Sequence, residues 1–154
     1  MRLILMSLVI GLVFSLLFAA PTCRAGENLK LNPKLDYSSD SNDGPHITGD
    51  QIDSGVISGR PNYVLMYGEG CYNSKRQSRR TVQLYEKYRG RVNFVIIDLD
   101  HALSNPQLDL VKKYYRGAIP HVVVLDPAGK AVYNAAGEVD EAEVSEILDK
   151  CVPR

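Results

Sequence analysis

The sequence has no excess of charge of either sign, because its 154 residues include 18 basic and 18 acidic side chains. A balanced chain of this kind lacks the basic patch that a nucleic-acid backbone requires. The glycine-rich phosphate-binding motifs of nucleotide-binding proteins are also absent, and His46, His101 and His121 lie far apart without a paired metal-ligand motif. The sequence therefore predicts one domain with no nucleic-acid partner, no metal site and no bound cofactor.

A long uncharged run follows Arg2 and extends as far as Cys23. This run predicts an export signal over residues 1–25, because Cys23-Arg24-Ala25 places small residues at the positions that a signal peptidase reads. Cleavage would leave a periplasmic or extracellular protein that is free of the membrane. An uncleaved, outward-facing membrane anchor is an alternative, since the run just reaches the about 17–25 residues that span a bilayer. A lipid-modified Cys23 is a third possibility.

Residues 26–45 are polar and rich in turn-forming types, which predicts a flexible linker with nothing to bury. Residues 46–154 form the predicted folded domain, in which apolar stretches of two different periods alternate. The expected elements are a strand at 46–48, a short helix within 49–58, a strand at 63–67, a helix at 72–89, a strand at 92–97, a helix at 107–115 with Leu108 facing inward, strands at 121–125 and 131–133, and a closing helix from about 140. This order predicts an α/β domain whose sheet has a parallel part and an antiparallel pair.

Cys71 lies where the apolar strand at 63–67 ends and the long helix begins, after a Gly-Glu-Gly turn. Backbone N–H groups at the start of a helix have no partner within the helix, and the helix dipole is positive there. A thiol in this position is shifted towards the thiolate, the form that attacks disulfides. The basic residues Lys75 and Arg76 follow within the first turn.

Cys71-Tyr72-Asn73-Ser74-Lys75 after a strand, together with Gly117-Ala118-Ile119-Pro120 before an apolar strand, resembles the active-site unit of the thioredoxin-like superfamily. The resemblance extends over residues 47–151. It implies a thioredoxin-like fold with a central mixed sheet of four to five strands flanked by helices. It also implies a cis Ile119–Pro120 bond, whose loop faces the cysteine and aligns the substrate.

The sequence departs from the family pattern at the positions that support fast dithiol chemistry. The second cysteine of the family's Cys-x-x-Cys motif is replaced by Ser74, so that the motif is Cys-x-x-Ser. The buried acid of the family corresponds to Leu65, its lysine falls near Ile96, and the tryptophan before the first cysteine is Gly70. The acid–base apparatus of a dithiol reductase is therefore absent.

The remaining chemistry is monothiol exchange with protein or small-molecule disulfides and thiols. Cys71 is the expected nucleophile, with Ser74 and backbone N–H groups stabilising its thiolate. A hydroxyl is a poor nucleophile at neutral pH, so Ser74 cannot release the mixed disulfide, and an external thiol such as glutathione must do so. Disulfide isomerisation and deglutathionylation both fit this scheme. The alternatives are a redox-silent thioredoxin-like module that binds clients, and a membrane-anchored scaffold.

Other residues near the motif have both a functional and a structural interpretation. Lys75 and Arg76 could bind anionic groups of a substrate whose backbone lies on Ile119 and Pro120, or they could belong to a solvated basic face. His121 could act as an acid or base for Cys71, or be an ordinary histidine at a strand end. Cys151 ends the last predicted helix, and we expect it not to pair with Cys71.

Overall fold

The computed structural model describes residues 28–50, 52 and 54–153. The predicted export segment, residues 1–25, lies outside this part of the chain. Among the helices of the described residues, none has the length and apolar character needed to cross a membrane.

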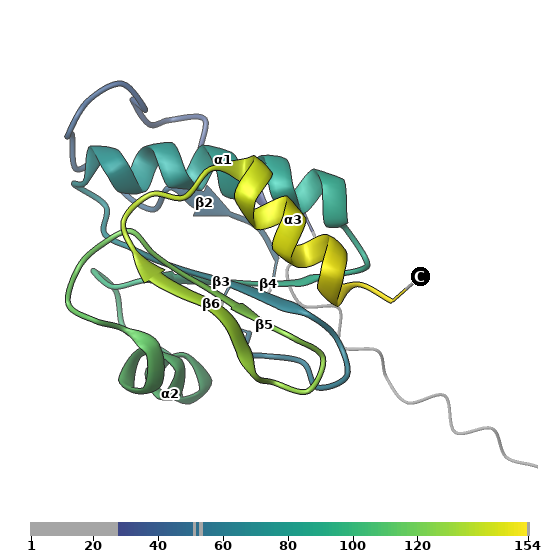
Figure 1. The fold of residues 1–154 in the computed structure, drawn as a ribbon. Helices are drawn as coiled ribbons and strands as arrows, with labels where there is room; N and C mark the ends of the chain where they lie inside the picture. Colours follow the sequence, from purple (N-terminus) through teal and green to yellow (C-terminus); the bar gives the residue numbers. More distant parts are fainter. Residues whose placement is uncertain (1–27, 51, 53, 154) are drawn as a thin grey trace, which may run out of the picture.

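A mixed four-stranded sheet forms the centre of the described part of the chain, in the order β4-β3-β5-β6. Strand β3 pairs with β4 in parallel and with β5 in antiparallel, and β5 pairs with β6 in antiparallel. Helices α1 and α3 cover one face of this sheet, and α2 covers the other (Figure 1). The bounds are β3 Asn62–Tyr67, α1 Tyr72–Tyr88, β4 Asn93–Asp98, α2 Asn105–Tyr114, β5 His121–Leu125, β6 Ala131–Ala136 and α3 Glu141–Cys151. The predicted mixed sheet flanked by helices is confirmed.

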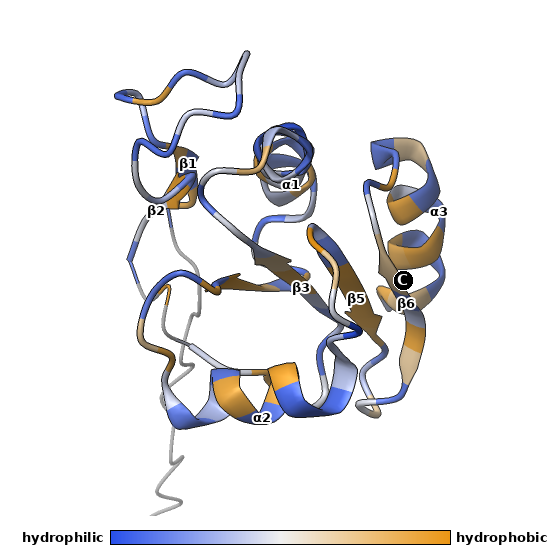
Figure 2. Cartoon of the chain, turned by 90° about the vertical axis from the view of Figure 1, so that its left-hand side faces the viewer, coloured by the Kyte–Doolittle hydropathy of each residue, from blue (hydrophilic) through white to orange (hydrophobic). Residues whose placement is uncertain are grey.

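Strand β3 is buried on both faces, which explains its continuous apolar sequence. Tyr63, Leu65 and Tyr67 pack towards α1 and α3, whereas Val64 and Met66 pack towards α2. This alternation follows from the two-residue period of a strand. The view along the sheet shows the mainly apolar strands enclosed between helices that each carry a polar outer side (Figure 2). The end of β3 is therefore held rigidly, and the residues that follow it are well positioned.

The segment before residue 46 packs on the domain and differs from the predicted flexible linker. Strand β1 (Lys30–Leu31) pairs in antiparallel with β2 (Ile47–Thr48). Leu29 is only 2% exposed and belongs to the core beneath α1. One buried leucine and a short strand pair are enough to fix this segment, although its average composition is polar. The folded unit thus includes residues before the predicted boundary at 46.

Two further details differ from the sequence-based expectation. The described residues between 49 and 58 form turns and irregular structure in place of the predicted short helix, and Val56 is 47% exposed. In α2, Leu108 is 38% exposed, whereas Gln107 is buried. The Gln107 side chain donates hydrogen bonds to the carbonyls of Ile52 and Ile96, which satisfies its amide inside the protein. A polar residue therefore occupies the inward position that the apolar pattern assigned to its neighbour.

Candidate active site around Cys71

Cys71 is the N-cap residue of α1 and is partly exposed. Its carbonyl accepts the first hydrogen bond of the helix from the Lys75 N–H at 3.0 Å, and its own N–H donates to the Gly68 carbonyl at 3.4 Å. The sulfur is therefore carried by the tight turn that connects the most buried strand to the longest helix of the described chain. This geometry fixes the Cys71 side chain next to the positive end of α1.

The loop before β5 lies against the turn that leads to Cys71. The Ile119–Pro120 bond is cis, as the resemblance implied, and Pro120 is buried. Because His121 pairs with Met66, the residues before β5 run beside those that follow β3. A Cβ atom built on Gly68 would lie 2.6 Å from Cδ1 of Ile119, so the Ile119 side chain lies directly against this turn. The structure thus brings Ile119 and Pro120 to the same end of the sheet as Cys71.

Ser74 is completely buried in the first turn of α1. Its Oγ forms no hydrogen bond with any described residue, including Cys71. The predicted hydroxyl contact with the sulfur is therefore not made in this state. Ser74 nevertheless stands three residues after Cys71, at the position of the resolving cysteine in the Cys-x-x-Cys motif.

Lys75 has an internal role in place of the predicted contact with substrate. Its side chain is completely buried, and Nζ donates hydrogen bonds to the Asp36 carbonyl at 2.7 Å and to Ser41 Oγ at 2.6 Å. Nζ also lies 3.6 Å from the Asp43 carboxylate. Residues 36–43, which we call the 36–43 loop, are thereby fastened to α1. A fully coordinated, buried ammonium is not available to bind a substrate anion.

Arg76 is likewise engaged within the protein. Its guanidinium forms a two-point interaction with the Glu138 carboxylate, with Nε 2.9 Å from Oε2, and lies over the Tyr72 ring. Arg80 approaches the same carboxylate to 2.9 Å. Hydrogen bonding from Arg76, followed by the charges of Arg76 and Arg80, outweighs partial burial and lowers the pKa of Glu138. Arg76 and Arg80 therefore join α1 to the segment before α3, which carries Glu138.

The 36–43 loop contributes directly to the start of α1. The Tyr72 N–H donates a hydrogen bond of 2.6 Å to Asp40 Oδ1. A Cβ atom on Gly70 would lie 3.8 Å from Cβ of Asn42, which places the loop beside the turn before Cys71. In Figure 1 this loop arches past the N-terminal end of α1. The Asp40 carboxylate therefore binds one of the N–H groups at the positive end of α1 and adds a negative charge beside the Cys71 sulfur. Composition gave no indication of this contact.

His121 lies on the face of the sheet that α2 covers. Its side chain is buried, Nε2 lies 2.7 Å from Asn134 Oδ1, and its ring makes an edge contact with Tyr115. Cys71 begins α1, which covers the opposite face. This placement gives no support to the predicted acid or base role of His121 at the thiol.

The positions of the family's buried acid and lysine are apolar here. Leu65 and Ile96 are paired in register on β3 and β4, and each is at most 1% exposed. Neither can relay a proton to the sulfur. The structure thus places buried apolar side chains at the two positions where the resemblance implied an acid and a lysine.

Carboxylates instead gather beside the turn, on Glu69 and Asp98. Glu69 is 7% exposed, and its N–H donates to Asp100 Oδ2 at 2.6 Å. Burial raises the pKa of the Glu69 carboxyl, and the neighbouring charge of Asp98 adds to this effect. His101 Nδ1 lies 3.5 Å from Glu69 Oε1. The sequence alone did not indicate this group, because only the parallel register of β3 and β4 brings these residues together.

His46 holds the same turn from the other side. Its ring is buried and stacked on Tyr67, with centroids 4.5 Å apart. Nε2 lies 2.7 Å from the Glu69 carbonyl, and Nδ1 lies 3.2 Å from Ser78 Oγ. Burial lowers the pKa of this imidazole, so it is neutral at pH 7. His46 therefore joins the β2 segment, the turn and α1.

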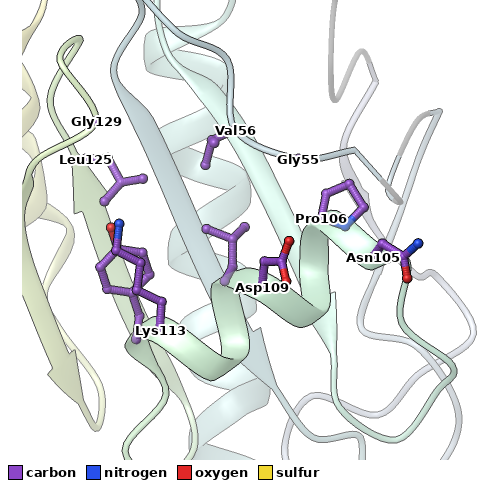
Figure 3. A pocket seen from close by; sticks show the side chains of 10 residues that line it. Gly55, Val56, Asn105, Pro106, Asp109, Lys113, Leu125 and Gly129 are labelled. Atoms are coloured by element: carbon purple, nitrogen blue, oxygen red, sulfur yellow. The ribbon is translucent and has the colours of Figure 1, made fainter.

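A cavity of about 600 Å³ lies on the α2 side of the sheet (Figure 3). Asn105, Pro106, Asp109 and Lys113 of α2 face Gly55 and Val56 across it, and Leu125 and Gly129 close one end (Figure 3). Cys71 is not among its lining residues. This cavity is separate from the candidate site.

Cys71 and Cys151 are both free thiols, as expected for residues that do not pair. Cys151 ends α3, and burial, with a smaller contribution from Asp126, raises the pKa of its thiol. A thiol with a raised pKa is less reactive at neutral pH. Cys71 is therefore the better placed nucleophile of the two.

No protein-family model matches the sequence. The chain is similar to a protein from Synechocystis named as a thiol:disulfide interchange protein TxlA homolog, with 34% identity over 80 residues, covering 52% of this chain and 43% of the relative. It is also similar to the chloroplastic thioredoxin-like protein HCF164 of Arabidopsis thaliana, with 24% identity over 123 residues, covering 79% and 45%. The chain thus spans less than half the length of these curated relatives.

Solved structures share the architecture. A thioredoxin-like protein from Clostridium perfringens has a TM-score of 0.52 and 20% identity, over 62% of this chain and 73% of the other. Thioredoxin-2, named as a component of the malaria parasite protein secretion machinery, has a TM-score of 0.52 and 17% identity, over 62% and 86%. These neighbours show a thioredoxin-like fold, and the names of the relatives support a place in the thioredoxin-like superfamily.

Proposed function

We propose that this thioredoxin-like protein carries out monothiol thiol–disulfide exchange through Cys71. The observation that carries the proposal is the position of Cys71, which is partly exposed at the N-cap of α1, on the same end of the sheet as Ile119 and Pro120. A helix start favours the thiolate. The similarity to a named thiol:disulfide interchange protein supports the same class of chemistry.

The proposed cycle has two exchange steps. In the first, the Cys71 thiolate attacks one sulfur of a substrate disulfide, a Cys71–substrate disulfide forms, and the other substrate sulfur leaves as a thiolate. In the second, a thiolate of glutathione or of a second substrate cysteine attacks the substrate sulfur of the mixed disulfide, forms a new disulfide with it and releases the Cys71 thiolate. The external step is needed because Ser74 replaces the resolving thiol. Isomerisation and deglutathionylation are the two outcomes that this cycle permits.

Ile119 and Pro120 provide the surface on which the substrate backbone lies next to the sulfur. Lys75 and Arg76 take no part in substrate binding in this proposal, because their charges are already coordinated by Asp36, Ser41 and Glu138. His121 has no role either, because its ring is buried on the α2 face. Recognition of the substrate therefore rests on the Ile119–Pro120 surface and the adjacent 36–43 loop.

A second function is favoured by the 36–43 loop itself. The Asp40 carboxylate next to the start of α1 opposes a second negative charge on Cys71, and the loop flanks the turn. A redox-silent module that binds clients on the Ile119–Pro120 surface would tolerate such a loop. The two functions differ in whether client binding needs the Cys71 sulfur.

The deciding experiment is exposure of the full chain to glutathione disulfide, followed by intact-mass measurement. Exchange predicts one glutathione adduct that maps to Cys71, is lost in Cys71→Ser and is retained in the control Cys151→Ser. Ser74→Cys is expected to release the adduct by forming an internal disulfide. If Cys71→Ser keeps the same clients in a pull-down and wild type forms no adduct, the exchange proposal fails and the binding module stands.

Export remains a proposal that rests on the uncharged run and on Cys23-Arg24-Ala25. With cleavage before Gly26, the mature protein works outside the cytoplasm, and with retention it is anchored and faces outward. N-terminal sequencing of the protein from its producing cell tests this. A chain that still begins at Met1 and sediments with membranes would contradict cleavage.

A further inference from the structure

Three potential metal-ligating side chains converge beside the turn that precedes Cys71. Glu69 belongs to the turn after β3, Asp98 is the last residue of β4, and His101 lies in the loop that follows. One ligand atom from each lies within 4.8 Å of the other two. Tyr67 and Asp98 are paired in the parallel register, which brings the ends of both strands to one edge. The convergence is therefore fixed by the sheet.

The two carboxylates in this group have oxygen atoms without partners. Glu69 is more than nine-tenths buried, and its Oε1 accepts no hydrogen bond within the described chain. Asp98 Oδ2 is also buried and accepts none. The other Asp98 oxygen, Oδ1, is occupied by the Asp100 N–H at 3.1 Å. Buried carboxylate oxygens are ordinarily paired or bound to a metal, whereas here the neighbouring group that can carry a positive charge, His101, is exposed and lies at 3.5 and 3.8 Å.

The distances fit a small tetrahedral cation. His101 Nδ1 lies 3.5 Å from Glu69 Oε1 and 3.8 Å from Asp98 Oδ2. Zinc bonds to nitrogen and oxygen of about 2.0–2.1 Å place neighbouring tetrahedral ligands about 3.3 Å apart. The His101 nitrogen must therefore approach the two oxygens by about half an ångström or less. The His101 side chain is 58% exposed and has the freedom to make this adjustment.

The donor set and the surrounding space favour zinc over magnesium or calcium. Two carboxylates and an imidazole are ligands that zinc accepts with water in the fourth position, whereas calcium and magnesium need six or more oxygen ligands. A cavity of about 300 Å³, lined in part by Asp98 and His101, has room for that water. The backbone N–H of Glu69 donates to Asp100 Oδ2, which fixes the turn that carries the Glu69 side chain.

We propose that Glu69, Asp98 and His101 form a binding site for a divalent zinc-type cation that joins the ends of β3 and β4. The cation is coordinated by Glu69 Oε1, Asp98 Oδ2 and His101 Nδ1, with water completing the coordination. The site does not involve the Cys71 sulfur and is independent of the exchange reaction. Sequence spacing did not reveal it, because Glu69 is far in the sequence from Asp98 and His101.

The test is titration of the full chain with Zn²⁺ by calorimetry, and with Co²⁺ by visible absorption, after removal of metals with a chelator. The variant in which Cys23, Cys71 and Cys151 are all serine is the reference, because thiols also bind zinc. We expect one ion per chain in this variant, a rise in Tm with added Zn²⁺, and the strong visible bands of tetrahedral Co²⁺. Absence of saturable binding in this reference, or binding that requires a cysteine, would overturn the proposal.

Variants of the ligands separate binding from folding. His101→Ala alters an exposed side chain and is expected to weaken Zn²⁺ binding by at least about tenfold while leaving the metal-free Tm unchanged. Glu69→Gln retains the shape of the buried side chain and is expected to remove the Zn²⁺-dependent rise in Tm. Glu86→Gln, an exposed change on α1, is the matched control and should bind like the reference. Equal Zn²⁺ affinity in all three variants would contradict the assignment.

Discussion

Two groups of charged side chains flank the turn between β3 and α1, and they differ in how completely they are paired. On the α1 side, the Lys75 ammonium is buried and contacts Asp36, Ser41 and Asp43. On the β4 side, Glu69 is buried and Asp98 is partly buried, and Glu69 Oε1 and Asp98 Oδ2 accept no hydrogen bond within the described chain. We call these the paired side and the unpaired side.

The difference separates structural charges from charges that need a ligand. A buried charge with a full set of partners already contributes to the folded state, and removing it leaves those partners unsatisfied. A buried charge without partners opposes folding until something binds. Sequence alone placed Lys75 and Arg76 among the substrate-binding residues, whereas the contacts assign them to the framework. The predictions below test this division.

The largest effect is expected for Lys75→Met on the paired side. This change keeps the apolar stem but removes the ammonium, and so frees the 36–43 loop from α1. Hydrogen bonds to charged groups are worth about 1.5–3 kcal/mol, so we expect a loss of about 2 kcal/mol in the free energy of unfolding. Urea denaturation measures this loss. The control is Lys112→Met, which changes an exposed lysine of α2. Equal losses of stability in the two variants would contradict the structural role of the Lys75 charge.

Glu69→Gln on the unpaired side is expected to change stability in the opposite direction. Removing one of two adjacent buried carboxylate charges relieves desolvation and repulsion, so the metal-free protein should gain about 1 kcal/mol. The measurement is urea denaturation at pH 7 with a chelator present. A loss of stability would mean that the Glu69 charge is already satisfied and that the two sides are alike.

Asp40→Asn tests whether the paired side restrains Cys71. The amide still accepts the Tyr72 N–H, but the negative charge beside the helix start is gone. Helix-end charges are worth about 0.3–1 kcal/mol, so the rate of Cys71 alkylation at pH 7 should rise about two- to fivefold. Iodoacetamide labelling followed by peptide mass measurement reports this rate, with Asp50→Asn as the control. An unchanged rate would show that the loop affects Cys71 by contact alone.

The smallest effect is expected for Glu138→Gln, which weakens the link between Arg76 and the segment before α3. The folded pKa of Glu138 lies below its ordinary value of 4.5, so the ion pair stabilises the fold above that pH and its contribution disappears as the pH falls. Arg76 is 41% exposed, so screening by solvent keeps this contribution small. Thermal unfolding of the variant and wild type should therefore differ at pH 7 and converge in acid. A difference that grows in acid would contradict this assignment.

The sequence predicted most of the architecture because the relevant signals are local. The run from Tyr63 to Tyr67, the turn of glycines and the helical spacing after Cys71 each report their own element. The placement of the Ile119–Pro120 loop at the Cys71 end of the sheet followed from the family resemblance. Leu65 and Ile96, which the sequence analysis interprets as departures from the family pattern, are buried apolar residues in the structure.

The sequence could not predict contacts that depend on distant segments. Residues 26–45 were predicted to be a linker because Leu29 is one apolar residue among many polar ones, yet Leu29 lies in the core. The charge on Lys75 resembled a substrate ligand until its partners in the 36–43 loop were known. Glu69, Asp98 and His101 share no spacing motif, and only the register of β3 and β4 joins them.

The attachment of the 36–43 loop to α1 also determines how this region opens. The Tyr72 amide is protected from hydrogen exchange by Asp40, and the Lys75 ammonium keeps that loop in place. We therefore expect the first turn of α1 and residues 36–43 to open as one cooperative unit. Their amides should lose protection together and earlier than those near Leu84. A substrate that reaches Cys71 through this opening would meet a sulfur whose exposure is set by the local opening equilibrium.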